Sequence, residues 1–275
     1  MAIIQTSIQQ IEELLWNLGI RPNDTVMVHS SLFSLGKIEN GLDGFHAALR
    51  KSVGECGNII VPTYTWSFRR RQIYDVRNSM VPKEIGAYSE YLRKLPEAFR
   101  SLDPLFSMAA IGPHAQELMN RPSKACFGPG TTYEKLFALN MRILAIGITY
   151  STGISPFMHL ERLANVDYRR ELRFDGKSID YSGQTYDDWA IHFARNEKDY
   201  PNARTFRETV GRQMETKGIS IGLKFGYGRH VALSAKPFEE YVLSILHSNP
   251  MAMLVKDSHE YDQKYKSFFN NENYE

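Results

Sequence analysis

The chain has 275 residues, enough for one large domain or two small ones with an ample core. Its net charge of +2, from 33 basic and 31 acidic side chains, is too small to indicate a nucleic-acid partner. No apolar run approaches the ~18 residues of a membrane span, residues 1–6 lack the features of a signal peptide, and Cys56 and Cys126 form no metal or redox motif. We therefore expect a cytoplasmic protein that binds no membrane, nucleic acid or metal.

The first 62 residues alternate between helical and strand-like patterns. Apolar residues at helical spacing predict helices over residues 6–18 and 42–53, and short apolar runs predict strands over residues 25–29 and 58–62. A loop rich in small hydroxyl residues follows the first strand. The short connections and the helix–strand alternation favour an α/β fold with a mainly parallel sheet.

Residues 63–77 interleave aromatic and basic side chains. Four aromatic residues alternate with four arginines, and Asp75 is the one acid. The segment is either a solvated helix face with its aromatic side chains turned inward, or the lip of an active site that stacks on rings and attracts anions. Nucleic acid would fit the same chemistry, but one short cluster is weak evidence for it.

The middle of the chain continues the alternation. We predict helices over residues 83–95, 114–119 and 133–139, and a third buried strand over residues 105–112. The glycine-rich loop over residues 127–132 leads into a helix. Amides and hydroxyls at a helix N-terminus can hold phosphate or carbonyl oxygens, although such turns are also ordinary loop structure.

Residues 143–162 combine a buried strand with a helix that carries a histidine. The strand is predicted over residues 143–148, and Ser155 followed by Pro156 is typical of a helix start with a capping hydroxyl. His159 would then lie on the first turns of a helix at the carboxyl end of a strand, where α/β sheets bind ligands. It is a candidate general base. The alternative is a histidine packed or hydrogen-bonded at a helix–loop junction.

The remaining chain has an antiparallel character. Alternation over residues 168–174, a turn at residues 175–177 and a strand at 179–181 predict a hairpin, and residues 186–193 form a short strand or loop. Helices are predicted over 205–217 and 236–247, with a second hairpin between them, and the tail from residue 256 has little periodicity. We expect one composite domain over residues 1–275: a parallel part (1–165), an antiparallel part (166–255) and a tail (256–275).

Taken in order, several of these segments resemble the aminoglycoside 3-N-acetyltransferase family, also called antibiotic N-acetyltransferases. The motifs that carry the resemblance are Val28-His29-Ser30-Ser31-Leu32 with Gly36, Val61-Pro62-Thr63-Tyr64-Thr65, residues 100–107 (RSLDPLFS), Phe127-Gly128-Pro129-Gly130-Thr131, and the His159 helix followed by Tyr168-Arg169-Arg170. The resemblance implies an α/β/α sandwich with a central, mainly parallel sheet and an antiparallel C-terminal portion, distinct from the common small acetyltransferase fold.

The resemblance also implies a reaction and a set of site residues. The enzyme would move an acyl group from acetyl-CoA or another acyl-CoA to an amine, with no metal. The residues expected to bind the cofactor are Ser30, Ser31, Ser34, Gly36, Ser107, Gly128, Gly130 and Thr131. Lys37 is expected to bind a cofactor phosphate because of its charge, although the family pattern does not require it. The residues expected to bind the substrate are Tyr64, Trp66, Arg69, Phe157, Tyr168 and Arg169.

The chemistry of acyl transfer agrees with a histidine base. The attacking amine must lose a proton, which a neutral histidine can accept at pH 7, and hydrogen-bond donors such as Ser30 must face the oxyanion that forms. We expect His159, Ser30 and Glu161 to be catalytic. Many family members place a glutamate three residues after the base, where this chain has Arg162. Glu161 lies two residues after and could be a solvated acid instead, so the carboxylate that orients His159 could also come from Asp167, Asp187 or Asp188.

The expected substrate is the amine of an amino sugar. The basic segment at residues 63–77, residues 100–107 and Tyr168-Arg169 look closest to family members that N-acylate nucleotide-linked (dTDP- or UDP-) amino sugars for polysaccharide assembly. An aminoglycoside is the alternative substrate, and a non-catalytic CoA- or nucleotide-binding protein is the alternative of another class. The tail over residues 256–275 could pack against a second copy of the chain, so a homo-oligomer is among the expected partners.

Overall fold

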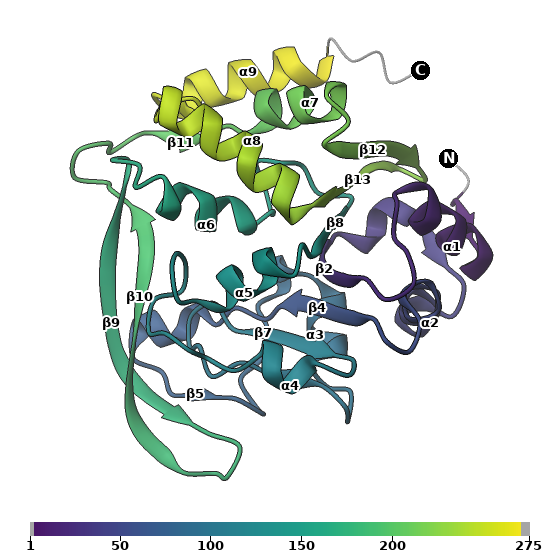
Figure 1. Cartoon of the computed structure of the whole chain (residues 1–275), viewed down its shortest axis with the longest axis horizontal. Coiled ribbons are helices and arrows are strands. Elements are labelled where there is room, and N and C mark those ends of the chain that lie inside the picture. The colour runs from purple at the N-terminus through teal and green to yellow at the C-terminus, as the bar shows by residue number, and fades with distance from the viewer. Residues whose placement is uncertain (1–2, 271–275) are drawn as a thin grey trace.

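A seven-stranded mixed sheet forms the centre of the computed structural model, which describes residues 3–270 (Figure 1). In spatial order its strands are β12 (Ser220–Phe225), β13 (Gly228–Ser234), β8 (Arg142–Ile146), β2 (Thr25–Ser30), β4 (Asn58–Pro62), β7 (Met108–Ile111) and β6 (Phe99–Arg100). β8, β2 and β4 are parallel to one another, and the outer strands are antiparallel to their neighbours. The expected α/β class is confirmed. Antiparallel pairing also occurs within the first 165 residues, at β4–β7 and β7–β6.

Helices cover both faces of this sheet because its strands alternate their apolar side chains between two cores. Val26 and Val28 of β2 pack on one face and Met27 on the other. The Val26 face is covered by α1 (Ile8–Asn17), α2 (Gly41–Val53) and α3 (Ala87–Leu92). The Met27 face is covered by α4 (Ala115–Leu118), α5 (Thr132–Ala138), α6 (Pro156–Leu163), α7 (Glu208–Thr216) and α8 (Ala235–Ser248). This is the expected α/β/α sandwich.

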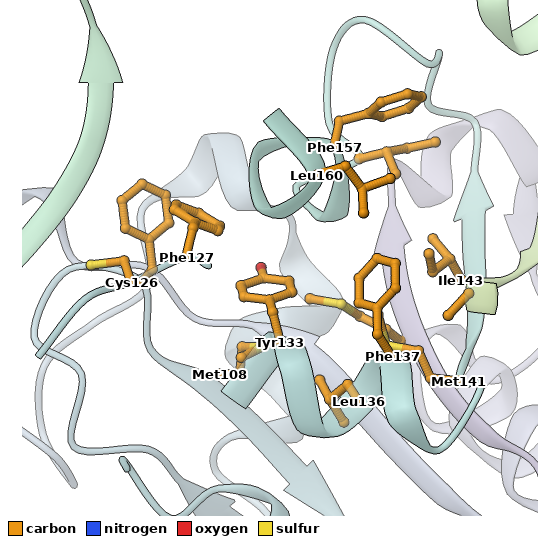
Figure 2. Close-up of a cluster of buried hydrophobic side chains, with 14 of the residues drawn as sticks. Met108, Cys126, Phe127, Tyr133, Leu136, Phe137, Met141, Ile143, Phe157 and Leu160 are labelled. Atoms are coloured by element: carbon orange, nitrogen blue, oxygen red, sulfur yellow. The ribbon is translucent and has the colours of Figure 1, made fainter. Parts of the chain in front are cut away.

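Figure 2 shows part of the second core, between α5, α6 and the sheet. Tyr133 and Phe137 of α5 lie below α6, which carries Phe157 and Leu160, and Ile143 comes from β8. Each of these side chains is at most 2% exposed. This packing holds α6, the next helix after β8 in the chain, firmly against the sheet.

A long two-stranded ribbon of β9 (Arg169–Ile179) and β10 (Thr185–Arg195) extends along one side of the molecule (Figure 1). The hairpin predicted here exists, but its turn lies at residues 180–184, and the turn predicted at residues 175–177 is wrong. Gly176 instead pairs with Asp188 inside the ribbon, and a Cβ there would lie 2.8 Å from the Phe68 ring. That glycine allows close packing, which a sequence pattern does not distinguish from a turn.

Several smaller predictions also need correction. The helix expected over residues 83–95 is a 3₁₀ turn, η3 (Lys83–Ile85), and the short α3, because Gly86 between them has φ of +111°. Ser155 does not cap α6; its hydroxyl shares a 2.7 Å hydrogen bond with the Tyr133 hydroxyl. The tail forms α9 (Ser258–Asn270), which lies beside α7 and α8 (Figure 1).

The other short elements are β1 (Gln5–Thr6) with β3 (Lys37–Ile38), β5 (Tyr74–Asp75) with β9, and β11 (Arg204–Thr205) with β14 (Leu254–Val255), and the 3₁₀ helices η1 (Leu32–Leu35) and η2 (Trp66–Arg70). β13, from the second part of the chain, pairs with β8 from the first. Both parts therefore share one sheet. Within residues 3–270, no helix is long and apolar enough to cross a membrane.

A buried ion-pair cluster joins α6 to the ribbon and to the start of α7. Glu161 is fully buried, and its carboxylate accepts from Arg169 Nε at 2.5 Å and from Arg207 Nη2 at 2.8 Å. Burial alone would raise the pKa of Glu161, but the two guanidinium groups outweigh it and hold that pKa below its ordinary value. Glu161 is therefore an ionised structural link and not a solvated acid.

Gly36 gives a test of the loop that follows β2. With φ of +82° and ψ of −152°, it has a conformation that favours glycine, and a Cβ would lie 2.5 Å from the Ile4 carbonyl oxygen. We expect Gly36→Ala to lower the free energy of unfolding by more than 2 kcal/mol, and the control Gly183→Ala, with φ of +86° and open space around it, by about 1 kcal/mol. Urea unfolding measures both, and equal losses would contradict the steric role of Ile4.

The Glu161 cluster predicts a pH-dependent stability difference. We expect Glu161→Gln to lower the free energy of unfolding at pH 7 by about 3 kcal/mol, because it leaves two buried guanidinium groups without their counter-ion. Because the folded-state pKa is lowered, this contribution is complete above the ordinary value of 4.5 and is lost as pH falls through the folded value. The difference between the proteins should therefore shrink in acid. The control Glu171→Gln removes a surface pair with Arg162 and should change stability by less than ~1 kcal/mol.

Candidate active site

A cleft opens at the carboxyl ends of the parallel strands. Its small chamber, of about 250 Å³, is lined by His29 near the end of β2, by Tyr64 after β4 and by Ser155 after β8, among others. Its large chamber, of about 710 Å³, lies against the β9–β10 ribbon and α9. The two chambers share Trp66, Phe106, Ser151 and Met158 as lining residues. This position, outside the carboxyl edge of a sheet, is where open α/β folds bind ligands.

His159 lies on α6 behind the cleft wall. Its neighbours in the helix, Met158 and Ser155, line the small chamber, whereas its own ring is 1% exposed and packs against Tyr133 and Phe137 at centroid distances of 5.8 and 4.8 Å. Burial lowers the pKa of His159 to about 4, so the ring is neutral at pH 7. The Gly128 amide donates to His159 Nδ1 at 3.2 Å, which places the ring proton on Nε2.

Three of the four carboxylates expected beside His159 pair with other side chains. Glu161 pairs with Arg169 and Arg207. Asp188 is buried on β10 and pairs with Arg121 at 2.9 Å and with Lys124, and Asp187 pairs with Lys177 at 2.6 Å. The hydrogen bond that orients the His159 ring therefore comes from a main-chain amide of the glycine-rich loop.

The residues expected to bind the cofactor fall into two groups. Ser30 ends β2, Ser31 and Lys37 are exposed, and the Ser34 hydroxyl donates to the Ser31 carbonyl at 2.7 Å, so this loop has surface to offer a ligand. Ser107 is fully buried, and its hydroxyl donates to the Thr63 carbonyl at 2.5 Å. Ser107 thus has no surface for a cofactor to contact.

The glycines and Thr131 of the expected cofactor set are explained in part by local packing. Gly36 allows the approach of Ile4, and a Cβ on Gly128 would lie 2.6 Å from the Arg162 side chain. The Thr131 hydroxyl donates to the Gly128 carbonyl at 2.7 Å and is buried. Gly130, with φ of +72°, has open space around its Cβ position. Cofactor binding by these residues stays a prediction.

Four of the six residues expected to bind substrate line the cleft. Tyr64 lines the small chamber, Arg69 and Arg169 line the large one, and Trp66 lines both. The Arg69 guanidinium lies 4.7 Å from the Trp66 ring centroid. The remaining two, Phe157 and Tyr168, are at most 1% exposed and belong to the core. Neither is among the residues that line the two chambers, and substrate binding by them stays a prediction.

The structure adds lining residues that the sequence did not indicate. His29 and Arg207 line the small chamber, and both are at least nine-tenths buried. The large chamber is also lined by Arg170, Arg195 and Arg204, and by Ser258, Tyr261 and Asp262 of α9. His29 was within a family motif but was not singled out. The sequence does not indicate that the α9 residues belong to the site, because nothing in their pattern relates them to a chamber formed by the ribbon.

Comparison with known sequences places the chain in a family. The family model described as aminoglycoside 3-N-acetyltransferase matches residues 27–247. Aminoglycoside N(3)-acetyltransferase VII of Streptomyces paromomycinus is 29% identical over an alignment of 228 positions, which covers 74% of this chain and 78% of that enzyme. Aminoglycoside N(3)-acetyltransferase IV of a Salmonella species is 31% identical over 156 residues, and the match spans 58% of its length and 56% of this chain.

Solved structures agree on the fold. The aminoglycoside acetyltransferase AAC(3)-Xa superposes with a TM-score of 0.78 at 25% identity, over 89% of this chain and 93% of its own. AAC-IIIb in a binary complex with CoASH superposes with a TM-score of 0.77 at 20% identity, over 89% of this chain and 97% of its own. Sisomicin-bound AAC-VIa superposes with a TM-score of 0.78 at 22% identity, over 89% of this chain and 99% of its own. The expected N-acetyltransferase with a CoA thioester as co-substrate is confirmed at the level of this family, whereas no comparison supports a nucleotide-linked sugar. The chain belongs to the aminoglycoside 3-N-acetyltransferase family.

Proposed function

We propose that the protein transfers an acetyl group from acetyl-CoA to an amine of an amino sugar. The observation that carries this proposal is the two-chambered cleft at the carboxyl edge of β2, β4 and β8, in a chain of this family. Two chambers that share a wall offer room for two substrates to meet. The loop from Ser30 to Lys37, which follows β2, is the proposed binding surface for the CoA phosphates and pantetheine.

A general base must remove a proton from the attacking ammonium group. We propose His159 for this role on the strength of the family resemblance, and its neutral ring at pH 7 supports it. Nε2 has a free lone pair only when the ring proton is on Nδ1. A protonated Nδ1 can no longer accept from the Gly128 amide, so that hydrogen bond must break. Proton transfer through His159 is therefore linked to the conformation of the glycine-rich loop.

The acceptor has two candidates. An aminoglycoside is favoured by the relatives, which are named as aminoglycoside N(3)-acetyltransferases, and by the sisomicin bound to AAC-VIa. A nucleotide-linked amino sugar is the second candidate, and the observation that favours it is the basic and aromatic lip of Trp66 and Arg69 on the large chamber.

A substrate panel separates the two candidates. Release of free CoA thiol from acetyl-CoA can be followed with gentamicin-type aminoglycosides and with UDP- and dTDP-amino sugars. The named relatives predict turnover of an aminoglycoside, whereas the basic lip of the large chamber predicts turnover of a nucleotide-linked amino sugar. Turnover of nucleotide-linked amino sugars alone would overturn the aminoglycoside assignment, and turnover of aminoglycosides alone would overturn the second candidate. An inactive protein with every amine would overturn the proposed function.

Two substitutions at His159 separate a base from a structural histidine. Glutamine keeps an acceptor for the Gly128 amide but cannot take up a proton. If His159 is the base, His159→Gln and His159→Ala should each lower kcat by about 100-fold or more, with little change in the KM for acetyl-CoA. A His159→Gln enzyme that keeps its kcat within about threefold would show that the histidine only holds the loop. Circular dichroism and urea unfolding check that both variants are folded.

A further inference from the structure

The large chamber has a strong excess of positive charge. Five arginines line it, against the two acids Glu197 and Asp262. The arginines are Arg69, Arg169, Arg170, Arg195 and Arg204. They come from η2, from both strands of the ribbon and from β11. Segments far apart in the sequence thus bring like charges to one cavity, which costs free energy unless an anion binds there.

Most of these arginines lack an acidic partner in the described part of the chain. Arg169 pairs with Glu161, but none of the ion pairs within residues 3–270 involves the other four. Arg69 contacts His192 Nδ1 at 3.0 Å, and Arg195 and Arg204 each donate to the Ala203 carbonyl. A neutral ring and main-chain oxygens orient guanidinium groups without neutralising them.

Glu161 offsets only part of this excess. One buried carboxylate holds two arginines, so the Glu161 cluster keeps a net charge of +1 behind the wall of the large chamber. The adjacent His192 is neutral, because burial and the charges of Arg69 and Arg169 lower its pKa to about 3. No histidine charge is added, and the cationic character of the chamber comes from groups that stay charged at every physiological pH.

We propose that the large chamber binds a phosphate or diphosphate ester carried by the acyl acceptor. Guanidinium groups bind phosphate oxygens in bidentate geometry, and several of them around one cavity suit a group with two negative charges. The same positive charges would repel a polycationic acceptor. The inference rests on the proposed function, because it names the chemical class of the amino sugar whose amine is acetylated.

CoA also carries phosphates, so the source of the anion has to be tested. The proposed CoA surface, from Ser30 to Lys37, follows β2, whereas the arginines lie on η2, the ribbon and β11. If the large chamber serves the acceptor, CoA and a nucleoside diphosphate bind together. If it serves CoA, the two compete.

Calorimetric titration of the full chain with UDP and with pyrophosphate tests the inference without any need for turnover. The ribbon offers a matched pair of variants: Arg170, exposed and in the large chamber, and Arg173, three residues along β9, which pairs with Asp175 on the surface and is 57% exposed. We expect Arg170→Gln to raise the Kd for both probes about tenfold, the effect of losing one charge-assisted hydrogen bond. Arg173→Gln should leave the Kd within about twofold.

The second arm repeats the UDP titration on enzyme saturated with CoA. A Kd unchanged within about threefold is expected, and loss of UDP binding would overturn the assignment to the acceptor. Equal Kd values for the Arg170→Gln and Arg173→Gln proteins would overturn the site itself. Both arms measure binding and not turnover. A protein that acetylates no amine would overturn the proposed function, whereas the UDP and pyrophosphate titrations would still test the phosphate site.

Discussion

One carboxylate, that of Glu161, sets the geometry on which the cleft depends. It is fully buried and holds Arg169 at the start of the ribbon and Arg207 at the start of α7. Each of these arginines lines a different chamber. The ion pairs therefore fix the position of α6 relative to the ribbon and to the start of α7. A charge in such a position is costly to bury and is stable only because both of its oxygens are paired.

The parallel strands supply the other constraint. β8, β2 and β4 end at one edge of the sheet. The last residues of β2 bring His29 to the small chamber, and the segments after β4 and β8 bring Tyr64 and Ser155. His159 lies one turn further along α6, where aromatic side chains exclude water and keep its ring neutral. The same helix thus carries both the histidine proposed as the base and the carboxylate that pairs with Arg169 and Arg207.

The sequence predicted local structure better than it predicted contacts. The strands β2 and β4 follow from their apolar patterns, since burial on both faces leaves a continuous apolar run. The turn at residues 175–177 was placed wrongly because Gly176 serves packing against Phe68. Phe157 and Tyr168 were assigned to the substrate because aromatic residues beside a motif look alike whether they face a ligand or the core. Glu161 looked exposed because its partners, eight and 46 residues later, are close only in the folded chain.

The contribution of α9 has a consequence for how the site comes into being during synthesis. Residues of β2, β4 and β8 leave the ribosome early, and they can pair before the rest of the protein exists. Ser258, Tyr261 and Asp262, which complete the large chamber, are made after every strand of the central sheet. A nascent chain can therefore assemble the strands of its central sheet while the large chamber still lacks the wall that α9 supplies. Completion of this chamber is among the last events of the protein's synthesis.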